Sequence, residues 1–304
     1  MPRETRGMMY GLLGVCGFGL TLPATKAVIP YMDPIFIGLG RAVIAALFAG
    51  ALLLVYRPNL PSLAQFKKLV WVVLGVIVGF PVLSSWAMQY VPAAHGGVVL
   101  GILPLATAVA GVILGGERPS VQFWIVGVIG SILVIVYAML QGSGNLRIAD
   151  LALLGAIMSA AIGYAIGGKL AKELGGWQCI CWALLVAFPF ILLPALARMP
   201  ESLAKIPASG YLGFLYLSVV SQLLAFFAWY RGLALGGIAR VSQAQLLQPF
   251  ITLIASAFLL GETIDIKTIL FALLVAFSVW LGKKMPIGAG KNNPHSSTVD
   301  VTVQ

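Results

Sequence analysis

Long apolar stretches, separated by short polar or glycine- and proline-containing segments, dominate the chain. Each stretch approaches or exceeds the roughly 20 apolar residues that an α-helix needs to cross a bilayer. Several neighbours lie only a few residues apart, so consecutive helices must run antiparallel. The pattern predicts ten transmembrane helices, over residues 8–28, 34–55, 69–91, 95–115, 121–140, 150–170, 177–197, 210–230, 238–260 and 264–283.

Two of these stretches repeat each other. Residues 102–117 (ILPLATAVAGVILGGE) and 247–262 (LQPFITLIASAFLLGE) both place a proline 13 residues before a glutamate that follows a glycine. Adding 145 to a residue number in the first gives the matching residue in the second, so Glu117 corresponds to Glu262. We therefore predict that the chain duplicates a five-helix unit.

A unit of five helices crosses the membrane an odd number of times, so its second copy enters from the other side. The predicted fold class is an all-α integral membrane protein of ten transmembrane helices, built as two inverted five-helix repeats. The first repeat covers residues 1–145 and the second 146–284, followed by a disordered cytoplasmic tail at 285–304. Inversion also predicts that Glu117 and Glu262 end their helices on opposite membrane surfaces, on the order of 30 Å apart.

The composition requires lipid as the solvent. The 304 residues are 60% hydrophobic and 9% charged, with a mean hydropathy of +1.01. Globular domains are typically about 45–50% apolar and about 25% charged, and a soluble chain of this length could not bury so much apolar surface. The three cysteines show neither disulfide-framework nor metal spacing, so we expect them to pack as small apolar side chains.

The basic residues predict the orientation of the chain in the membrane. The net charge of +10 is scattered over short loops, which argues against a nucleic-acid-binding surface. If the N-terminus is cytoplasmic, twelve Lys and Arg residues fall on the cytoplasmic side and five on the other. Cytoplasmic loops carry an excess of such residues, so both termini are predicted to be cytoplasmic.

The order of these features resembles that of the EamA-type drug/metabolite transporter superfamily. Each copy has an apolar run with a central proline and a closing Gly-Glu, and the first copy has Thr-Lys at 25–26 and a Gly-Arg pair ending at Arg41. Over residues 8–284 the chain is similar to the YddG-like exporters of aromatic and neutral amino acids. The resemblance implies a bacterial inner-membrane exporter whose cavity is lined by helices 1, 3, 4, 6, 8 and 9. The second copy departs from the pattern at Leu184, where Arg41 would map.

Few ionisable groups lie within the predicted helices. No Asp or Glu falls inside a span except at the ends, where Asp150 and Asp265 lie, although intramembrane carboxylates are the usual proton relays of pumps and antiporters. His95, at the start of the fourth helix, titrates closest to neutral pH. It is either a proton-coupling or substrate-binding residue, or an interfacial hydrogen-bonding group. A facilitative exporter fits the sequence at least as well as a proton-coupled one.

Neutral polar and aromatic side chains are therefore the candidates for a cavity. The ninth helix carries polar residues at helical spacing from Ser242 to Ser256. Three glutamines within six residues exceed what packing requires, because each amide needs partners in lipid. Hydrogen bonding between helices is the alternative explanation. The predicted substrate-binding residues are Phe80, Ser84, Trp86, Gln89, His95, Tyr164, Gln222, Trp229, Ser242, Gln245 and Gln248.

Three basic residues inside or near the ends of spans have two explanations. Lys26, Arg41 and Arg240 either attract a substrate carboxylate or extend to the membrane surface, as long basic side chains near helix ends commonly do.

Together these patterns predict a secondary transporter that exports aromatic or neutral amino acids and related small metabolites by alternating access. A multidrug, nucleoside or sugar exporter of the same superfamily, or a passive channel, is the alternative. We expect no enzyme, because the spans lack convergent nucleophiles, carboxylates and metal ligands. No GxxxxGK[ST] loop is present for ATP drive. The expected partners are a small solute and the lipid bilayer, with no cofactor, metal or nucleic acid. A monomer is the simplest assembly, although the sequence does not fix the oligomeric state.

Overall fold

The computed structural model describes residues 2–91, 93–140, 148–251 and 266–289, and the statements below concern those residues. All ten predicted spans contain helix there, the ninth as far as residue 251. The spans of the first copy are α1 (Arg3–Phe18) with α2 (Thr21–Val28), α3 (Pro34–Tyr56), α4 (Leu63–Val72) with η1 (Val73–Gly79) and α5 (Phe80–Ala87), α6 (Ala93–Val99) with η2 (Leu100–Ile102) and α7 (Leu103–Ile113), and α8 (Val121–Leu140).

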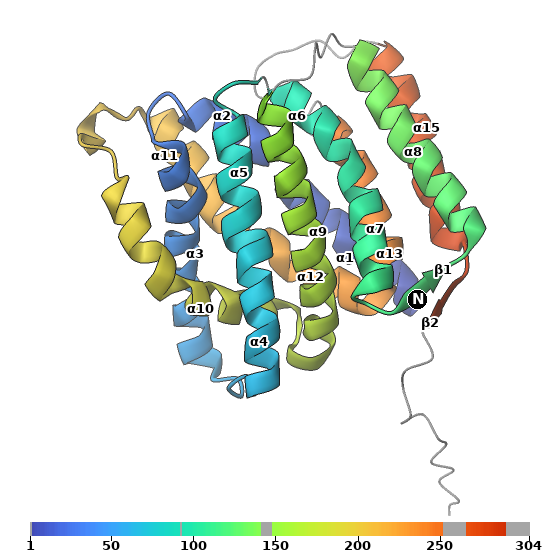
Figure 1. Ribbon diagram of the computed structural model, residues 1–304, viewed down its shortest axis with the longest axis horizontal. Coiled ribbons are helices and arrows are strands. Elements are labelled where there is room, and N and C mark those ends of the chain that lie inside the picture. Colours follow the sequence, from blue (N-terminus) through green and yellow to red (C-terminus); the bar gives the residue numbers. More distant parts are fainter. Residues whose placement is uncertain (1, 92, 141–147, 252–265, 290–304) are drawn as a thin grey trace, which may run out of the picture.

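The five stretches predicted for the second copy hold a similar series of elements. These are α9 (Ile148–Leu174), α10 (Gly176–Ala197), α11 (Ala208–Leu215) with η4 (Tyr216–Leu224) and α12 (Ala225–Gly236), α13 (Ile238–Ser242) with η5 (Gln243–Leu247), and α15 (Ile266–Lys284). A short 3-10 helix, η3 (Leu203–Lys205), lies between α10 and α11. Figure 1 shows the spans as a helical bundle in which α8 and α15 lie side by side at one edge.

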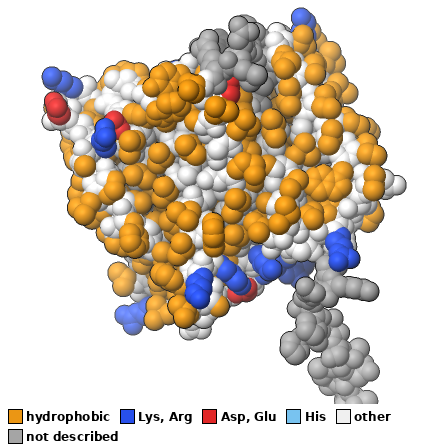
Figure 2. Space-filling model, in the orientation of Figure 1, with side chains coloured by type: hydrophobic (Ala, Val, Ile, Leu, Met, Phe, Trp, Pro, Cys, Tyr) orange, Lys and Arg blue, Asp and Glu red, His pale blue; other side chains and the backbone are white. Residues whose placement is uncertain are grey.

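Six helical stretches of the described chain are long and apolar enough to cross a membrane. Large apolar side chains are exposed along the bundle, for example Leu54 at 77% and Phe190 at 75%. Figure 2 shows hydrophobic side chains over most of the visible face. Because water would disfavour such a surface, the chain is a helical, multi-pass membrane protein. The full count of ten membrane crossings remains a prediction.

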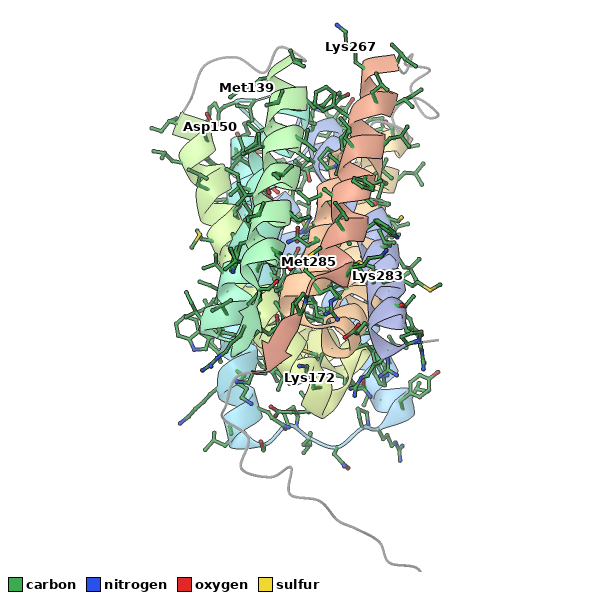
Figure 3. The ribbon with its side chains drawn as sticks, turned by 90° about the vertical axis from the view of Figure 1, so that its right-hand side faces the viewer. Met139, Asp150, Lys172, Lys267, Lys283 and Met285 are labelled. Carbon is green, nitrogen blue, oxygen red and sulfur yellow. The ribbon has the colours of Figure 1, made fainter. Side chains whose placement is uncertain are left out.

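Positive charge gathers at one end of the bundle, which we call the basic end: the end at which α4 begins and α9 finishes. Figure 2 shows Lys and Arg side chains along this lower edge and fewer at the upper one. Lys172 lies at the basic end, whereas Asp150 and Lys267 lie at the opposite end (Figure 3). In the described chain, Lys and Arg side chains are therefore more frequent at the end that the sequence assigns to the cytoplasm.

The first helices of the two copies run in opposite directions. α1 begins near the basic end (Figure 1), whereas α9 runs from Asp150 at the opposite end to Lys172 at the basic end (Figure 3). An inverted repeat requires this arrangement.

Departures from regular α-helix also recur at matched positions. The π-helical segments η1 and η4 begin 143 residues apart, at Val73 and Tyr216. The 3-10 segments η2 and η5 also begin 143 residues apart, at Leu100 and Gln243. Such segments change the rotation of a helix and often mark functional positions.

Glycines allow the helices of the two copies to approach closely. α1 packs along α12, and η1 and α5 pack along α9. A Cβ atom at Gly232 would lie 2.7 Å from the backbone nitrogen of Gly11, and one at Gly75 would lie 2.7 Å from the Cα of Gly163. Small residues give membrane helices this close backbone contact, so these glycines define the interface between the copies.

The predicted disordered tail at 285–304 is wrong at its start. Strand β2 (Ile287–Ala289) pairs antiparallel with β1 (Glu117–Pro119), with Arg118 opposite Gly288. The reason is local: β1 follows the turn at Gly116, whose φ is +72°, and offers an unpaired edge to the chain leaving α15. Residues 290–304 lie outside the described part.

Candidate functional site

A cavity lies between the two copies. The volume of the cavity that the centre of a water molecule can occupy is only about 20 Å³. This is room for about one water. A larger solute would therefore require the lining to move apart. The first copy contributes Phe18, Thr21, Leu22, Arg41, Val76, Phe80, Leu100 and Leu103, and the second contributes Tyr164, Ser221, Phe226 and Gln248.

The lining is built from matched positions of the two copies. Val76 and Ser221, each in a π-helical segment, stand 145 residues apart, as do Leu103 and Gln248. Phe80 and Phe226 stand 146 apart, as do Phe18 and Tyr164. The cavity therefore draws equivalent positions of both copies into its lining.

Aromatic rings form one wall of the cavity. The ring centroids of Phe18 and Phe226 are 5.0 Å apart, and those of Tyr164 and Phe226 are 6.1 Å apart. Trp229 is fully buried behind them, in T-shaped contact with Tyr164 at 5.3 Å. Edge contacts of this kind hold rings in defined orientations. The cavity therefore offers an apolar wall suited to an aliphatic or aromatic group.

Hydrogen bonds join the copies beside this wall. The hydroxyl oxygens of Thr21 and Ser221 are 2.8 Å apart. Gln222 was predicted to bind substrate, but its Nε2 donates to the backbone oxygen of Val76 at 3.3 Å. This bond links η4 to η1, so the two π-helical segments are tied together at the cavity.

Arg41 is the charged side chain of the cavity lining. It is 2% exposed, so it does not extend to the membrane surface. Within the described chain no acidic group lies within 4.0 Å of it, its Nε lacks a hydrogen-bond partner, and the phenol of Tyr164 lies close by. An uncompensated buried charge costs several kcal/mol, which makes Arg41 the most unusual group of the site.

The other two basic candidates are engaged elsewhere. The Lys26 ammonium donates to the backbone oxygens of Met88 at 2.7 Å and Val91 at 3.1 Å, at the end of α5. Arg240 forms an ion pair with Glu4 at 2.6 Å. Neither lines the cavity, so Arg41 alone of the three is placed to meet a solute there.

Three of the predicted site residues line the cavity: Phe80, Tyr164 and Gln248. Two others, Trp86 and Gln89, do not line it and lie at the end of α5. Gln89 is exposed, and its Nε2 donates to the backbone oxygen of Trp86 at 3.2 Å. Of the third predicted span (69–91), therefore, only the middle lines the cavity.

Both predicted serines satisfy backbone carbonyls. The Ser84 hydroxyl donates to the oxygen of Phe80 at 2.6 Å, within its own helix. The Ser242 hydroxyl donates to the oxygen of Pro104 at 3.1 Å and to that of Ala239 at 2.8 Å. This is the hydrogen-bonding explanation that competed with cavity lining.

The structure describes the surroundings of the Gln245 side chain but not those of the His95 side chain. Gln245 is buried beside the Tyr164 phenol, and neither of its amide atoms has a well-formed hydrogen bond in the described structure. It would meet a solute group that reached Tyr164. His95 falls in α6, but its side chain lies outside the described part, so its role remains a prediction.

The candidate set omitted Phe18, Thr21 and Phe226, which also line the cavity. The repeat carried a usable signal for two of them. Phe18 and Phe226 are the counterparts of Tyr164 and Phe80, 146 residues away. Mapping Phe80 and Tyr164 onto the other copy with the offset of 145 gives Ala225 and Gly19, each one residue away from the lining residue.

Glu117 holds the two copies together at the basic end. Its Oε1 accepts a hydrogen bond from the backbone nitrogen of Ile238 at 2.6 Å, and its Oε2 accepts one from that of Ala239 at 2.7 Å. The carboxylate thus caps the start of α13, where backbone donors lack helical partners. The prediction made Glu117 a boundary residue; the structure also makes it a contact between the copies.

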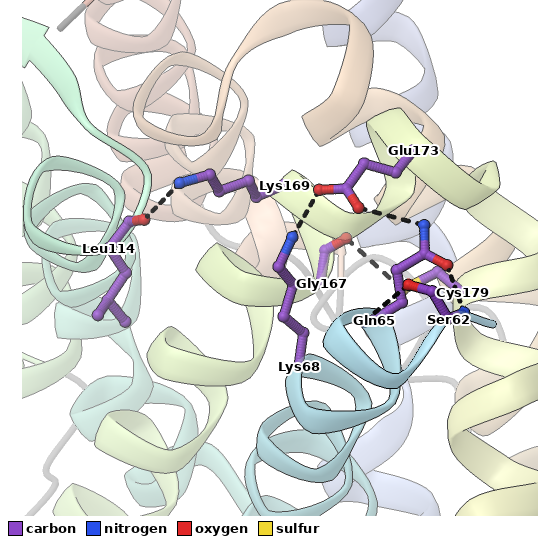
Figure 4. A network of polar contacts seen from close by, with 8 residues as sticks. All are labelled: Ser62, Gln65, Lys68, Leu114, Gly167, Lys169, Glu173 and Cys179. Atoms are coloured by element: carbon purple, nitrogen blue, oxygen red, sulfur yellow. Dashed lines mark hydrogen bonds and ion pairs between the residues drawn. The ribbon is translucent and has the colours of Figure 1, made fainter. Parts of the chain in front are cut away.

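Further polar contacts join the copies nearby (Figure 4). Lys68 of α4 forms an ion pair with Glu173 of α9 at 2.6 Å, and Lys169 donates to the backbone oxygen of Leu114 at 3.5 Å. Together with the Glu4–Arg240 pair and the β1–β2 pairing, these contacts join the two copies at the basic end.

A helical membrane protein with a cavity between two similar halves has an architecture that is common among membrane transporters. Its sequence matches the EamA-like transporter family twice, over residues 5–140 and 147–282, and the chain belongs to that family.

Several of its relatives are named as transporters. The chain is 43% identical to the "Uncharacterized transporter YdeK" of Bacillus subtilis over 264 residues, covering 87% of this chain and 92% of the relative. It is 26% identical to the "Probable amino-acid metabolite efflux pump" of Salmonella typhimurium, covering 89% and 92%. A solved crystal structure aligns with a TM-score of 0.73, covering 91% of this chain and 98% of its own, and at 14% identity it shows the fold alone.

Proposed function

We propose that this protein is a secondary transporter that exports aromatic and neutral amino acids and related small metabolites across the bacterial inner membrane by alternating access. The observation that carries the proposal is the cavity lined by matched positions of both copies, together with the hydrogen bonds between the copies at the basic end. Two inverted copies can exchange conformations, which moves the opening from one side to the other.

Three observations support the inverted repeat and its ten crossings. The family matches the chain twice in succession. α1 and α9 run in opposite directions, and the π-helical and 3-10 segments recur at a constant separation. The excess of Lys and Arg at the basic end supports a cytoplasmic location for it and for both termini.

The cavity chemistry supports amino acids as the solutes. The aromatic wall suits an apolar side chain, and the hydroxyls and amides at Thr21, Ser221 and Gln248 suit polar groups. The name of the Salmonella relative points to the same class. A cationic multidrug substrate fits less well, because the described lining contains no carboxylate. A nucleoside or sugar exporter and a passive channel remain the alternatives.

Counterflow in proteoliposomes tests the proposal. Vesicles loaded with unlabelled phenylalanine should accumulate labelled leucine transiently and saturably, because a carrier returns faster when loaded. Vesicles without protein are the control, and loading with a nucleoside or a sugar tests the alternative solutes. Uptake that neither saturates nor responds to internal amino acid would contradict a carrier and favour a channel.

A further inference from the structure

Among the described residues, none supplies a counter-ion to Arg41. It lies seven residues after the start of α3 at Pro34, which places it about 10 Å along that helix. Its side chain points between the copies rather than into lipid, since it is buried and lines the cavity. Over the described residues it has no ion pair.

A structural role for this guanidinium is disfavoured by two comparisons. Lys26 and Arg240 show how basic side chains stabilise this fold: the first binds two backbone carbonyls, and the second pairs with Glu4. Arg41 does neither. At the matched position of the other copy stands Leu184, fully buried and apolar. The packing of this helix therefore does not require a cation.

The charge of the cavity is one-sided. Its described lining holds one guanidinium and no Asp or Glu, and its remaining polar groups are neutral hydroxyls and an amide. Guanidinium groups bind carboxylates through two parallel hydrogen bonds. An ammonium would find only neutral acceptors, such as the Gln248 amide and the Tyr164 hydroxyl.

We propose that Arg41 binds the carboxylate of the solute, and that the cavity requires this carboxylate while it leaves the amino group dispensable. The transport consequence rests on the function proposed above, whereas the binding preference does not. Carboxylates that lack an amine should then bind as well as amino acids do. Amines and amides of the same shape should not.

Binding to the purified protein tests this preference without transport. The readout is the rise in melting temperature in detergent, titrated with L-phenylalanine, 3-phenylpropionate, L-phenylalaninamide and phenethylamine. The first two should stabilise the wild type, and the last two should not. Arg41→Gln should lower the affinity for both carboxylates at least about tenfold, because a charged hydrogen-bonded pair is lost. The carboxylate affinity of Arg41→Lys should lie between those of the wild type and Arg41→Gln.

Two further variants make the test decisive. Arg198→Gln removes an exposed arginine that does not line the cavity, and this variant should bind like the wild type. Arg41→Leu copies Leu184 and supplies a second neutral variant should Arg41→Gln fail to fold. Equal stabilisation by the amide and the acid, no stabilisation of the wild type by either carboxylate, or undiminished carboxylate affinity in the neutral variants would overturn the proposal.

The outcome separates this inference from the transport function. Counterflow of amino acids that is unchanged in Arg41→Gln would overturn the role of Arg41 and leave the carrier intact. Carboxylate binding that depends on Arg41, in a protein without counterflow, would overturn the carrier and leave the binding site.

Discussion

Replacing Glu117 by alanine should open the basic end. The substitution removes two short hydrogen bonds from a carboxylate to the backbone nitrogens of Ile238 and Ala239. Hydrogen bonds to charged groups contribute roughly 1.5–3 kcal/mol each. Their loss should therefore shift the balance between closed and open forms by on the order of 3 kcal/mol, or about a hundredfold. Glu117→Gln keeps one neutral acceptor and should have a smaller effect.

A buried reporter cysteine measures this opening. Ala108 is fully buried in a small apolar cluster with Phe123 and Ala239 at the basic end. In a chain without its natural cysteines, Ala108→Cys should react slowly with a thiol reagent and much faster once Glu117→Ala is added. Glu201→Ala, a change in an exposed loop at the other end, is the control. An unchanged labelling rate in Glu117→Ala would mean that this carboxylate does not hold the end closed.

Replacing Gly232 by valine should disrupt the contact between α1 and α12. Even a first Cβ would lie 2.7 Å from the backbone nitrogen of Gly11 and 2.9 Å from the backbone oxygen of Gly7. Backbone atoms cannot move aside as a flexible side chain can. Overpacking typically costs about 1–3 kcal/mol, and we expect the upper part of this range or loss of the folded protein.

The matched control lies on α3. A Cβ at Gly50 would meet only the Leu185 side chain, at an ordinary 3.7 Å. Gly50→Ala should therefore leave the melting temperature in detergent unchanged or raise it slightly, since alanine favours helix. Equal thermal stability of Gly232→Val and Gly50→Ala would show that the close α1–α12 contact is not needed.

The positions of the helices could be predicted because the bilayer fixes the length of each apolar stretch. The site was harder to predict because the helices are not regular. The polar stripe through Ser242 and Gln245 assumed 3.6 residues per turn, but η5 is a 3-10 helix with about three. The rotation accumulated over Gln243–Leu247 brings Gln248, from the flank of that stripe, into the cavity.

The roles of two charged residues depended on tertiary structure. Whether Arg41 faces lipid, water or a cavity depends on the rotation of α3 within the bundle, which an almost wholly apolar helix does not encode. Glu117 was correctly expected where the chain leaves α7. Its contact with α13 arises only because the turn at Gly116 brings the first copy to the start of a helix in the second.

A cysteine placed in the cavity tests alternating access most directly. Ser221→Cys changes one atom of a lining residue in η4. In a chain without other cysteines, a membrane-impermeant thiol reagent added to the medium should label this cysteine in right-side-out vesicles, through the outer face of the protein. It should also label the cysteine in inverted vesicles, through the cytoplasmic face. Transported amino acid should slow both reactions. Labelling from one side only, or passage of the reagent into the vesicle lumen through the protein, would contradict a carrier that opens its cavity alternately to each side.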